Sequence, residues 1–328
     1  MPPKKGKQVV EELKKESEKG LALAEQIMLA EKMDPLKLRK ALEHYLEHWN
    51  DFTHVGLFVR ACESVGGKPD ENTLAQAAIA LMAAAFDLHD DILDRSKAKN
   101  KVPTVYGKFG VEISLLLGNA FLIEGLKTFS NALEIFPPEK REKILEDTKK
   151  LLFEVGNAHV LEICLKQRKR VNPNDYLEIT ELKAASIEAD LMLGALFGGG
   201  SVEEIANLAK VGRILGVLAT LRDDLVDVFD IEELRQRIAV QDLPLPLLLA
   251  LQDKKTRLST STILSKPKIT QNDVADLVDL TLQTKSIIKM KGRMQLLVEE
   301  GLSLLSKLPK QKLHNKLQVV VSFMLEDL

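Results

Sequence analysis

Cysteine, aromatic residues, net charge and long apolar runs are all scarce in this sequence. Two cysteines in 328 residues, Cys62 and Cys164, favour a reducing compartment over a disulfide framework. A formal net charge of −2 argues against nucleic acid as the main partner. No apolar run approaches the roughly 20 residues that a membrane span needs, and no signal-peptide core follows the basic N-terminus. We therefore expect a soluble, cytoplasmic protein that neither spans a membrane nor binds nucleic acid.

What the sequence does contain is helical periodicity. Apolar residues recur at intervals of three and four in nearly every segment, and no cluster of strands or long linker interrupts them. With 45% hydrophobic residues the chain has ample material for a large core. We predict one all-α domain over residues 1–328, a bundle of about a dozen helices around a central cavity. The expected helices cover residues 9–33, 34–49, 51–65, 70–94, 110–136, 137–164, 174–198, 202–227, 245–251, 270–284, 287–305 and 308–328.

Two acidic motifs with the same internal spacing each follow an apolar helical run. The first is Asp90-Asp91-Ile92-Leu93-Asp94, and the second is Asp223-Asp224-Leu225-Val226-Asp227. In each motif the first and last aspartates lie one helical turn apart on the same face. Carboxylates that converge in this way repel each other unless a cation joins them, and hard oxygen ligands suit Mg²⁺. All six aspartates are therefore predicted ligands for Mg²⁺.

Paired acidic helix ends of this kind suit a diphosphate substrate. Two or three Mg²⁺ ions held between them would neutralise the charge that grows on a diphosphate as its carbon–oxygen bond breaks. Met82 and Phe86 lie two turns and one turn below Asp90 on the same helical face. We interpret these two residues either as ordinary core or as an apolar floor for a hydrophobic tail on the diphosphate.

The two motifs resemble the DDxxD pair of the trans-isoprenyl diphosphate synthases, also called the polyprenyl synthetase family, which has the class I isoprenoid synthase fold. The resemblance continues through Pro103–Gly110 and Leu215-Gly216. It implies an allylic isoprenyl diphosphate as substrate and a homodimer with residues 110–136 as its interface. It also implies catalytic roles for Asp90, Asp94, Asp223 and the diphosphate-binding Lys183. His159 replaces a glutamine of the family pattern and is a further candidate for substrate binding.

The sequence departs from the family where isopentenyl diphosphate, the usual acceptor, would bind. Asp51 falls at a lysine position, His54 at an arginine and Ala83 at a histidine. The arginine pair after the first motif becomes Lys99 and Asn100, of which Lys99 would contact the allylic diphosphate. A lysine downstream of the second motif becomes Asp242. Since each lost charged hydrogen bond costs about 1.5–3 kcal/mol, we expect weak binding of a second diphosphate.

These departures favour a Mg²⁺-dependent prenyltransferase that passes the prenyl group to a non-standard acceptor. Asp51 and His54 would orient or deprotonate that acceptor. The alternative is a conventional head-to-tail synthase of short or medium chains, with Phe86 setting product length and other basic residues holding isopentenyl diphosphate. Those residues are Arg60, Lys68, Arg95, Lys97 and Lys101. Donor length and acceptor stay open.

Two further alternatives also stay open. The first is a terpene cyclase or diphosphate hydrolase, for which an aromatic content of 5% leaves few rings to steady cations. The second is a regulatory subunit, which the two complete motifs argue against.

Overall fold

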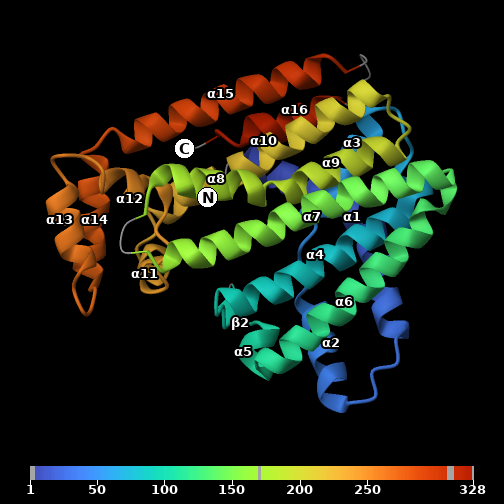
Figure 1. Cartoon of the computed structure of the whole chain (residues 1–328), viewed down its shortest axis with the longest axis horizontal. Helices are drawn as coiled ribbons and strands as arrows, with labels where there is room; N and C mark the ends of the chain where they lie inside the picture. Colours follow the sequence, from blue (N-terminus) through green and yellow to red (C-terminus); the bar gives the residue numbers. More distant parts are fainter. Residues whose placement is uncertain (1–3, 100, 169–170, 309–313, 327–328) are drawn as a thin grey trace. The chain divides into compact units, whose positions relative to one another are not determined.

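The computed structural model describes residues 4–99, 101–168, 171–308 and 314–326, and it confirms the all-α prediction. The only strands among these residues are β1 (Ala98–Lys99) and β2 (Val102–Pro103), which pair antiparallel with Ala98 opposite Pro103. No helix in the described ranges is long and apolar enough to cross a membrane. Figure 1 shows the arrangement of the helices along the chain.

The described chain forms two compact units, each assembled from separated stretches of sequence. The amino-terminal unit holds residues 7–146 and 190–205, and the carboxy-terminal unit holds residues 147–189 and 206–328 together with the start of the chain through Gly6. The boundaries fall inside helices, so the units are not successive domains of the sequence. The prediction of one domain over residues 1–328 stays a prediction.

Helices of the amino-terminal unit follow the predicted order with shifted ends. The expected helix over residues 70–94 begins with a short 3₁₀ segment, and the expected connection at 103–110 contains a short helix. Gly66, with φ of +86°, ends its helix as predicted, because glycine tolerates the left-handed region. The elements are α1 (Lys4–Ala30), α2 (Leu36–His48), α3 (Thr53–Ser64), η1 (Pro69–Asn72), α4 (Thr73–Leu93), β1, β2, α5 (Val105–Phe109), α6 (Val111–Ala132) and η2 (Leu133–Ile135).

Helix α4, which ends in the first acidic motif, packs along α6 (Figure 1). Glycines on α6 permit the close approach: a Cβ on Gly125 would lie 2.8 Å from Met82 Cγ, and one on Gly118 would lie 2.6 Å from His89 Nε2. Met82 is accordingly buried against α6, whereas Phe86 is half-buried. The contact fixes the direction in which α4 carries its acidic end.

The carboxy-terminal unit departs further from the prediction. The single helix expected over residues 174–198 is two helices that meet at Ala184, and two short helices, α11 and α13, were not predicted. A capping box opens α10, because Glu204 N donates to Ser201 Oγ and Ser201 N donates to Glu204 Oε2. Four of the described helices, α1, α7, α9 and α10, contribute residues to both units. The elements are α7 (Pro138–Lys166), α8 (Pro173–Lys183), α9 (Ala185–Phe197), α10 (Val202–Asp227), α11 (Ile231–Ala239), α12 (Leu245–Ala250), α13 (Arg257–Leu264), α14 (Gln271–Leu282), α15 (Ser286–Ser306) and α16 (His314–Phe323).

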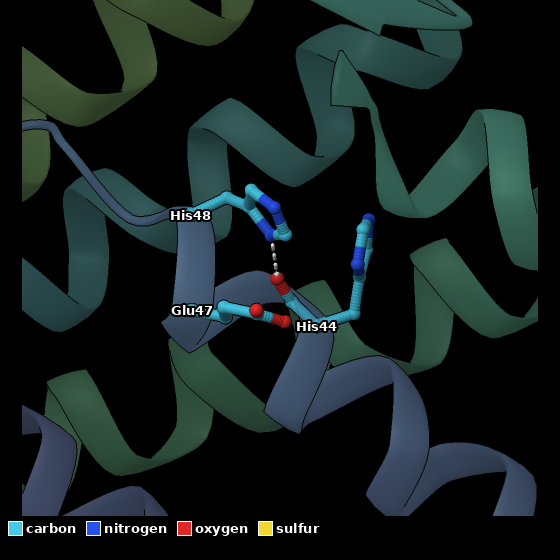
Figure 2. A group of neighbouring side chains, drawn as sticks. All are labelled: His44, Glu47 and His48. Carbon is cyan, nitrogen blue, oxygen red and sulfur yellow. Dashed lines mark hydrogen bonds between the residues drawn. The ribbon is translucent and has the colours of Figure 1, made fainter.

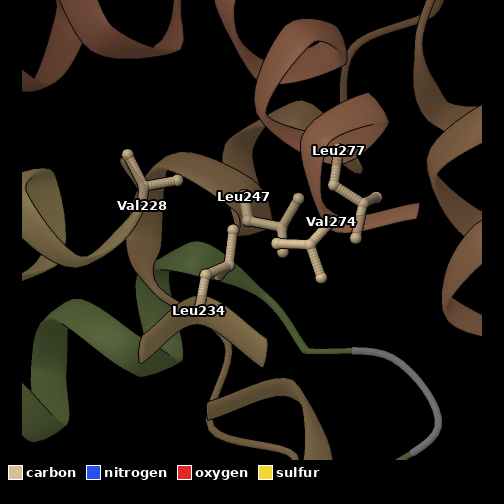
Figure 3. Packing of buried hydrophobic residues seen from close by; sticks show 5 residues of the cluster. All are labelled: Val228, Leu234, Leu247, Val274 and Leu277. Atoms are coloured by element: carbon tan, nitrogen blue, oxygen red, sulfur yellow. The ribbon is translucent and has the colours of Figure 1, made fainter. Parts of the chain in front are cut away.

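A small apolar core lies directly beyond the second acidic motif. Fully buried side chains from the turn after α10, from α11, from α12 and from α14 pack together, as Figure 3 shows; they are Val228, Leu234, Leu247, Val274 and Leu277. Because α11 and α12 are short, this shared burial rather than intrinsic helix propensity holds them in place. The core thereby fixes two helices beside the second acidic motif.

Candidate active site

The first acidic motif ends α4. Asp90 and Asp91 lie in its last turn, and Asp94 is its C-cap, with Asp94 N donating to Asp90 O at 2.8 Å. Asp91 is buried, while Asp90 and Asp94 are half-buried. Arg95, with φ of +56°, then turns the chain out of the helix. The helical spacing predicted for the three carboxylates is therefore present, and their role as metal ligands stays a prediction.

Lys99 folds back onto α4 from the β1–β2 hairpin. Its Nζ lies 2.6 Å from Asp87 Oδ1 and 2.8 Å from Asp91 Oδ1. Burial raises the pKa of Asp91 to about 6, although Lys99 acts in the opposite direction. Lys99 thus neutralises the buried carboxylate of the motif, and the diphosphate contact predicted for it would require exchange of these partners. Asn100, its neighbour in the family pattern, lies outside the described residues.

His54, at the start of α3, is held between two carboxylates. Its Nδ1 lies 2.6 Å from Oδ2 of Asp190, which is buried, and its Nε2 lies 4.0 Å from Asp51 Oδ2. Burial alone would lower the pKa of His54, but the carboxylates of Asp190 and Asp51 outweigh burial and raise that pKa to about 10. His54 is therefore an imidazolium at neutral pH. A protonated imidazole cannot accept a proton, so this geometry favours orientation of an acceptor over its deprotonation, and the contact of His54 with an acceptor stays a prediction. By the family resemblance, His54 places a positive group where relatives have an arginine.

The second motif ends α10, and its middle aspartate is fully engaged by protein groups. Asp224 Oδ1 accepts from the Tyr176 hydroxyl at 2.9 Å and lies 2.9 Å from an Arg237 nitrogen. Asp224 Oδ2 accepts from Leu245 N at 3.0 Å. With 1% of its surface exposed, Asp224 ties α8, α11 and α12 to α10. This geometry gives the predicted metal ligand Asp224 a structural role.

Arg237 is the functional candidate that sequence reasoning missed. It lies 2.8 Å from Asp227 Oδ2 and 3.1 Å from Asp242 Oδ2, in addition to its contact with Asp224. By the family resemblance Asp242 falls at a lysine position, and Arg237, five residues earlier on α11, supplies a cation to this region. Burial, followed by the charges of Asp227 and Asp224, raises the pKa of Asp223 to about 6. The negative charge at Asp242 was the signal that a cation had to lie nearby.

Lys183 is the last residue of α8, and it forms an ion pair with Glu162 on α7. Its Nζ lies 2.5 Å from Glu162 Oε2, and Glu162 Oε1 lies 3.7 Å from Lys166 Nζ. The helix breaks at Ala184, where α10 passes so close that a Cβ on Gly216 would lie 2.6 Å from Ala184 Cβ. This close approach explains why position 216, which belongs to the family resemblance, is a glycine. His159 lies half-buried on α7, three residues before Glu162, and its predicted contact with substrate stays a prediction.

A cavity of about 930 Å³ lies within the carboxy-terminal unit, with Lys166, Arg168, Arg257 and several leucines in its wall. A smaller pocket shares five wall residues with this cavity and includes Lys183 and Asp242. The first acidic motif belongs to the amino-terminal unit and the second to the carboxy-terminal unit. That both motifs line one central cavity stays a prediction.

Two complete aspartate motifs at the ends of helices in an all-α chain are typical of the isoprenoid synthases. Comparison with known proteins identifies the family. The family model described as polyprenyl synthetase matches residues 37–281, so the chain belongs to the polyprenyl synthetase family, as the motifs indicated. The chain is 27% identical over 215 residues to a geranylgeranyl diphosphate synthase of Methanosarcina mazei, covering 64% of each chain. It is 30% identical over 223 residues to geranylgeranyl pyrophosphate synthase 12, chloroplastic, of Arabidopsis thaliana, covering 64% of this chain and 61% of that relative. The matches span less than two thirds of the length of these curated relatives.

Solved structures confirm the fold. A geranylgeranyl pyrophosphate synthetase from Pyrococcus horikoshii superposes with a TM-score of 0.87 at 23% identity, covering 98% of this chain and 99% of that one. A polyprenyl synthase from Caulobacter crescentus, complexed with calcium and isoprenyl diphosphate, superposes with a TM-score of 0.81 at 20% identity, covering 96% and 97%. The predicted class I isoprenoid synthase fold is thereby confirmed.

Proposed function

We propose that the protein is a Mg²⁺-dependent prenyltransferase that ionises an allylic isoprenyl diphosphate. The observation that carries this proposal is the presence of both complete aspartate motifs at helix ends in a member of the polyprenyl synthetase family. Clusters of carboxylates are the donor set that Mg²⁺ takes, and Mg²⁺ shares its coordination with substrate phosphates. Asp90, Asp94 and Asp223 would hold the metal. When bound, Mg²⁺ supplies Lewis-acid activation of the diphosphate leaving group.

The chain's own residues would orient the diphosphate and balance its charge. Lys183 would leave Glu162 and Lys99 would leave Asp87 to donate hydrogen bonds to phosphate oxygens. Phe86 is half-buried one turn below Asp90, and it would contact the prenyl tail. Met82 is buried against Gly125, which supports a packing role over contact with substrate.

Isopentenyl diphosphate is the acceptor that the comparisons favour. The relatives carry names of geranylgeranyl and short-chain isoprenyl diphosphate synthases, which supports the conventional head-to-tail alternative better than the non-standard acceptor that the sequence departures favoured. The imidazolium of His54 supplies positive charge at an arginine position. Arg60 is not a substitute contact, because its buried guanidinium pairs with Glu12 and Glu16. Arg95, Lys97 and Lys101 are exposed and stay candidates.

A donor panel tests this function. Purified protein, Mg²⁺ and labelled isopentenyl diphosphate are incubated with dimethylallyl, geranyl or farnesyl diphosphate, and products are identified by mass spectrometry. Chain elongation with at least one donor, abolished in Asp223→Ala, is the expected result. Donor binding without elongation in any tube would overturn the proposed acceptor while leaving the ionisation step standing. Diphosphate release that does not need isopentenyl diphosphate would indicate a cyclase or hydrolase.

A specific observation supports a non-standard acceptor as the second candidate. Asp51 and Asp190 place two carboxylates around one imidazolium, so a second diphosphate would meet net negative charge there. The double variant Asp51→Lys, His54→Arg restores the family pattern. If the wild type elongates poorly and this variant elongates well, the non-standard acceptor is supported; equal elongation by both argues for the conventional synthase.

The homodimer stays a proposal with structural support on α6. This helix exposes large apolar side chains although its other face is buried against α4, and such a surface is typical of an interface. The exposed side chains are Val111, Leu115, Leu116, Ile123 and Leu126.

A further inference from the structure

Helix α2 carries a cluster of metal-ligating side chains that the proposed reaction does not use. The run His44-Tyr45-Leu46-Glu47-His48 places two histidines one turn apart, with a glutamate beside them. One candidate ligand atom from each of His44, Glu47 and His48 lies within 4.8 Å of the other two. Figure 2 shows the three side chains rising from the same stretch of helix.

Hydrogen bonds to backbone carbonyls fix which nitrogen of each imidazole carries the proton. His44 Nε2 lies 2.8 Å from Pro103 O, and His48 Nδ1 lies 2.9 Å from His44 O (Figure 2). A carbonyl oxygen only accepts, so both of these nitrogens are protonated. A neutral ring then has its lone pair on the other nitrogen, which is Nδ1 in His44 and Nε2 in His48. Metal-ligating histidines are characteristically held in this way, with the second nitrogen donating to a carbonyl.

A cation already lies at one of these lone pairs. Lys108 Nζ, on α5, is 3.1 Å from His44 Nδ1, and an ammonium group has only donors to offer. This contact independently requires an unprotonated Nδ1, in agreement with the bond to Pro103. The contact also shows that the lone pair of His44 Nδ1 can be approached by a positively charged group. His44 is buried, whereas Glu47 and His48 are exposed and can adjust their rotamers to a ligand.

We infer that His44, Glu47 and His48 form a binding site for a divalent transition metal, with Zn²⁺ as the ion that fits best. Two imidazoles and one carboxylate are a donor set that Zn²⁺ takes in proteins, with a fourth position left to water. Mg²⁺ prefers oxygen donors and does not compete well for imidazole. The incoming ion displaces the Lys108 ammonium from His44 Nδ1. The site is independent of the aspartate motifs, so it stands or falls separately from the proposed prenyltransferase.

Metal binding here would also act on the hairpin that carries Lys99. A metal on Nδ1 withdraws electron density from the ring of His44 and strengthens the bond that Nε2–H donates to Pro103. Pro103 belongs to β2, which pairs with β1 and so with Lys99. Zn²⁺ would therefore hold this hairpin more firmly on α2.

Zinc titration of the full chain tests the site. Metal-stripped protein is titrated with Zn²⁺ by calorimetry in excess Mg²⁺, in an Asp90→Ala, Asp223→Ala background that weakens zinc binding at the aspartate motifs. One equivalent of Zn²⁺ should bind, and His48→Ala should weaken that binding by more than about tenfold. Glu43→Gln, on an exposed side chain of the same helix, is the matched control and should leave it unchanged. Zinc binding that His48→Ala does not alter would overturn the assignment.

Lys108→Met is expected to raise the zinc affinity, whereas His48→Ala should lower it. General destabilisation of the fold would not raise the affinity. Without the ammonium group, Zn²⁺ has no competitor at His44 Nδ1, so this variant should bind the ion more tightly than its parent. Cobalt substitution adds a spectroscopic readout, because Co²⁺ with two imidazoles shows visible absorption that His48→Ala should remove. Weaker zinc binding in Lys108→Met would contradict the proposed position of the metal.

Discussion

Replacing Arg237 with methionine removes the guanidinium that contacts Asp224, Asp227 and Asp242. Because Asp224 is 1% exposed, its charge is left buried with only the Tyr176 hydroxyl and Leu245 N to stabilise it. Breaking a buried ion pair in this way costs about 3–5 kcal/mol. At about 2.1 cal/mol/K of unfolding entropy per residue, 328 residues give about 0.7 kcal/mol/K. The expected fall in Tm is therefore about 4–7 °C.

The pH dependence of this variant has a definite sign. Burial already raises the pKa of Asp224, and loss of Arg237 raises that pKa further. A carboxyl whose folded-state pKa lies above its unfolded value destabilises the fold as pH rises. The deficit in unfolding free energy should thus be smaller at about pH 5 than at about pH 8, by urea unfolding.

A matched control lies on the same helix. Arg235 pairs with Glu232 at 2.8 Å on the exposed face of α11, so Arg235→Met should cost less than about 1 kcal/mol. Equal stability of the two variants would refute the assignment of Arg237 as the cation of the second motif. So would an Arg237→Met deficit that grows as pH falls.

Four more expectations can be checked directly. The pKa of His54 is raised to about 10, so its ion pairs stabilise the fold fully below about pH 6.5 and lose this effect toward about pH 10. His54→Gln should therefore flatten the pH dependence of the unfolding free energy in that window, measured by urea unfolding. Asp224→Asn should lower Tm more than Asp223→Asn, because Asp224 ties three helices together, while Asp223→Asn should weaken Mg²⁺ binding more, by calorimetry. Ile123→Glu should shift the mass measured by light scattering from dimer toward monomer; an unchanged mass would remove α6 from the proposed interface. Phe86→Ala should lengthen the prenyl product, and products of unaltered length would end its role in chain-length control.

Local patterns in the sequence predicted most of the helices and several of their ends. Helical periodicity, the Ser201 capping box and Gly66 depend on neighbours within one or two turns, so they can be read without tertiary information. The break after Lys183 could not, because the residues around Ala184 are good helix formers and the break coincides with the close passage of Gly216. Helix α11 is short and highly charged, and packing around Leu234 holds it in place.

The candidate site divides in the same way. The spacing of Asp90, Asp91 and Asp94 is local and was read correctly as one acidic helix end. The protonation of His54 depends on Asp190, which is 136 residues away, and no local pattern announces such a pairing. Arg237 was missed because its contacts with Asp224 and Asp227 join α11 to the end of α10, and no local pattern predicts that packing. Asp242, five residues after Arg237, was the local signal of a nearby cation.

The lysine pairs described above behave as built-in counter-ions. Lys99 pairs with Asp87 and Asp91, and Lys183 pairs with Glu162. Each ammonium would therefore have to leave a carboxylate before it could bind a diphosphate. In the proposed reaction, a metal ion bound beside Asp91 would take over the role of Lys99, and the Lys99 ammonium would then be free to bind the diphosphate. Binding would be an exchange of counter-ions, which favours a ligand that brings both charges at once. A diphosphate without its metal, or a metal alone, would have to displace the lysine unaided.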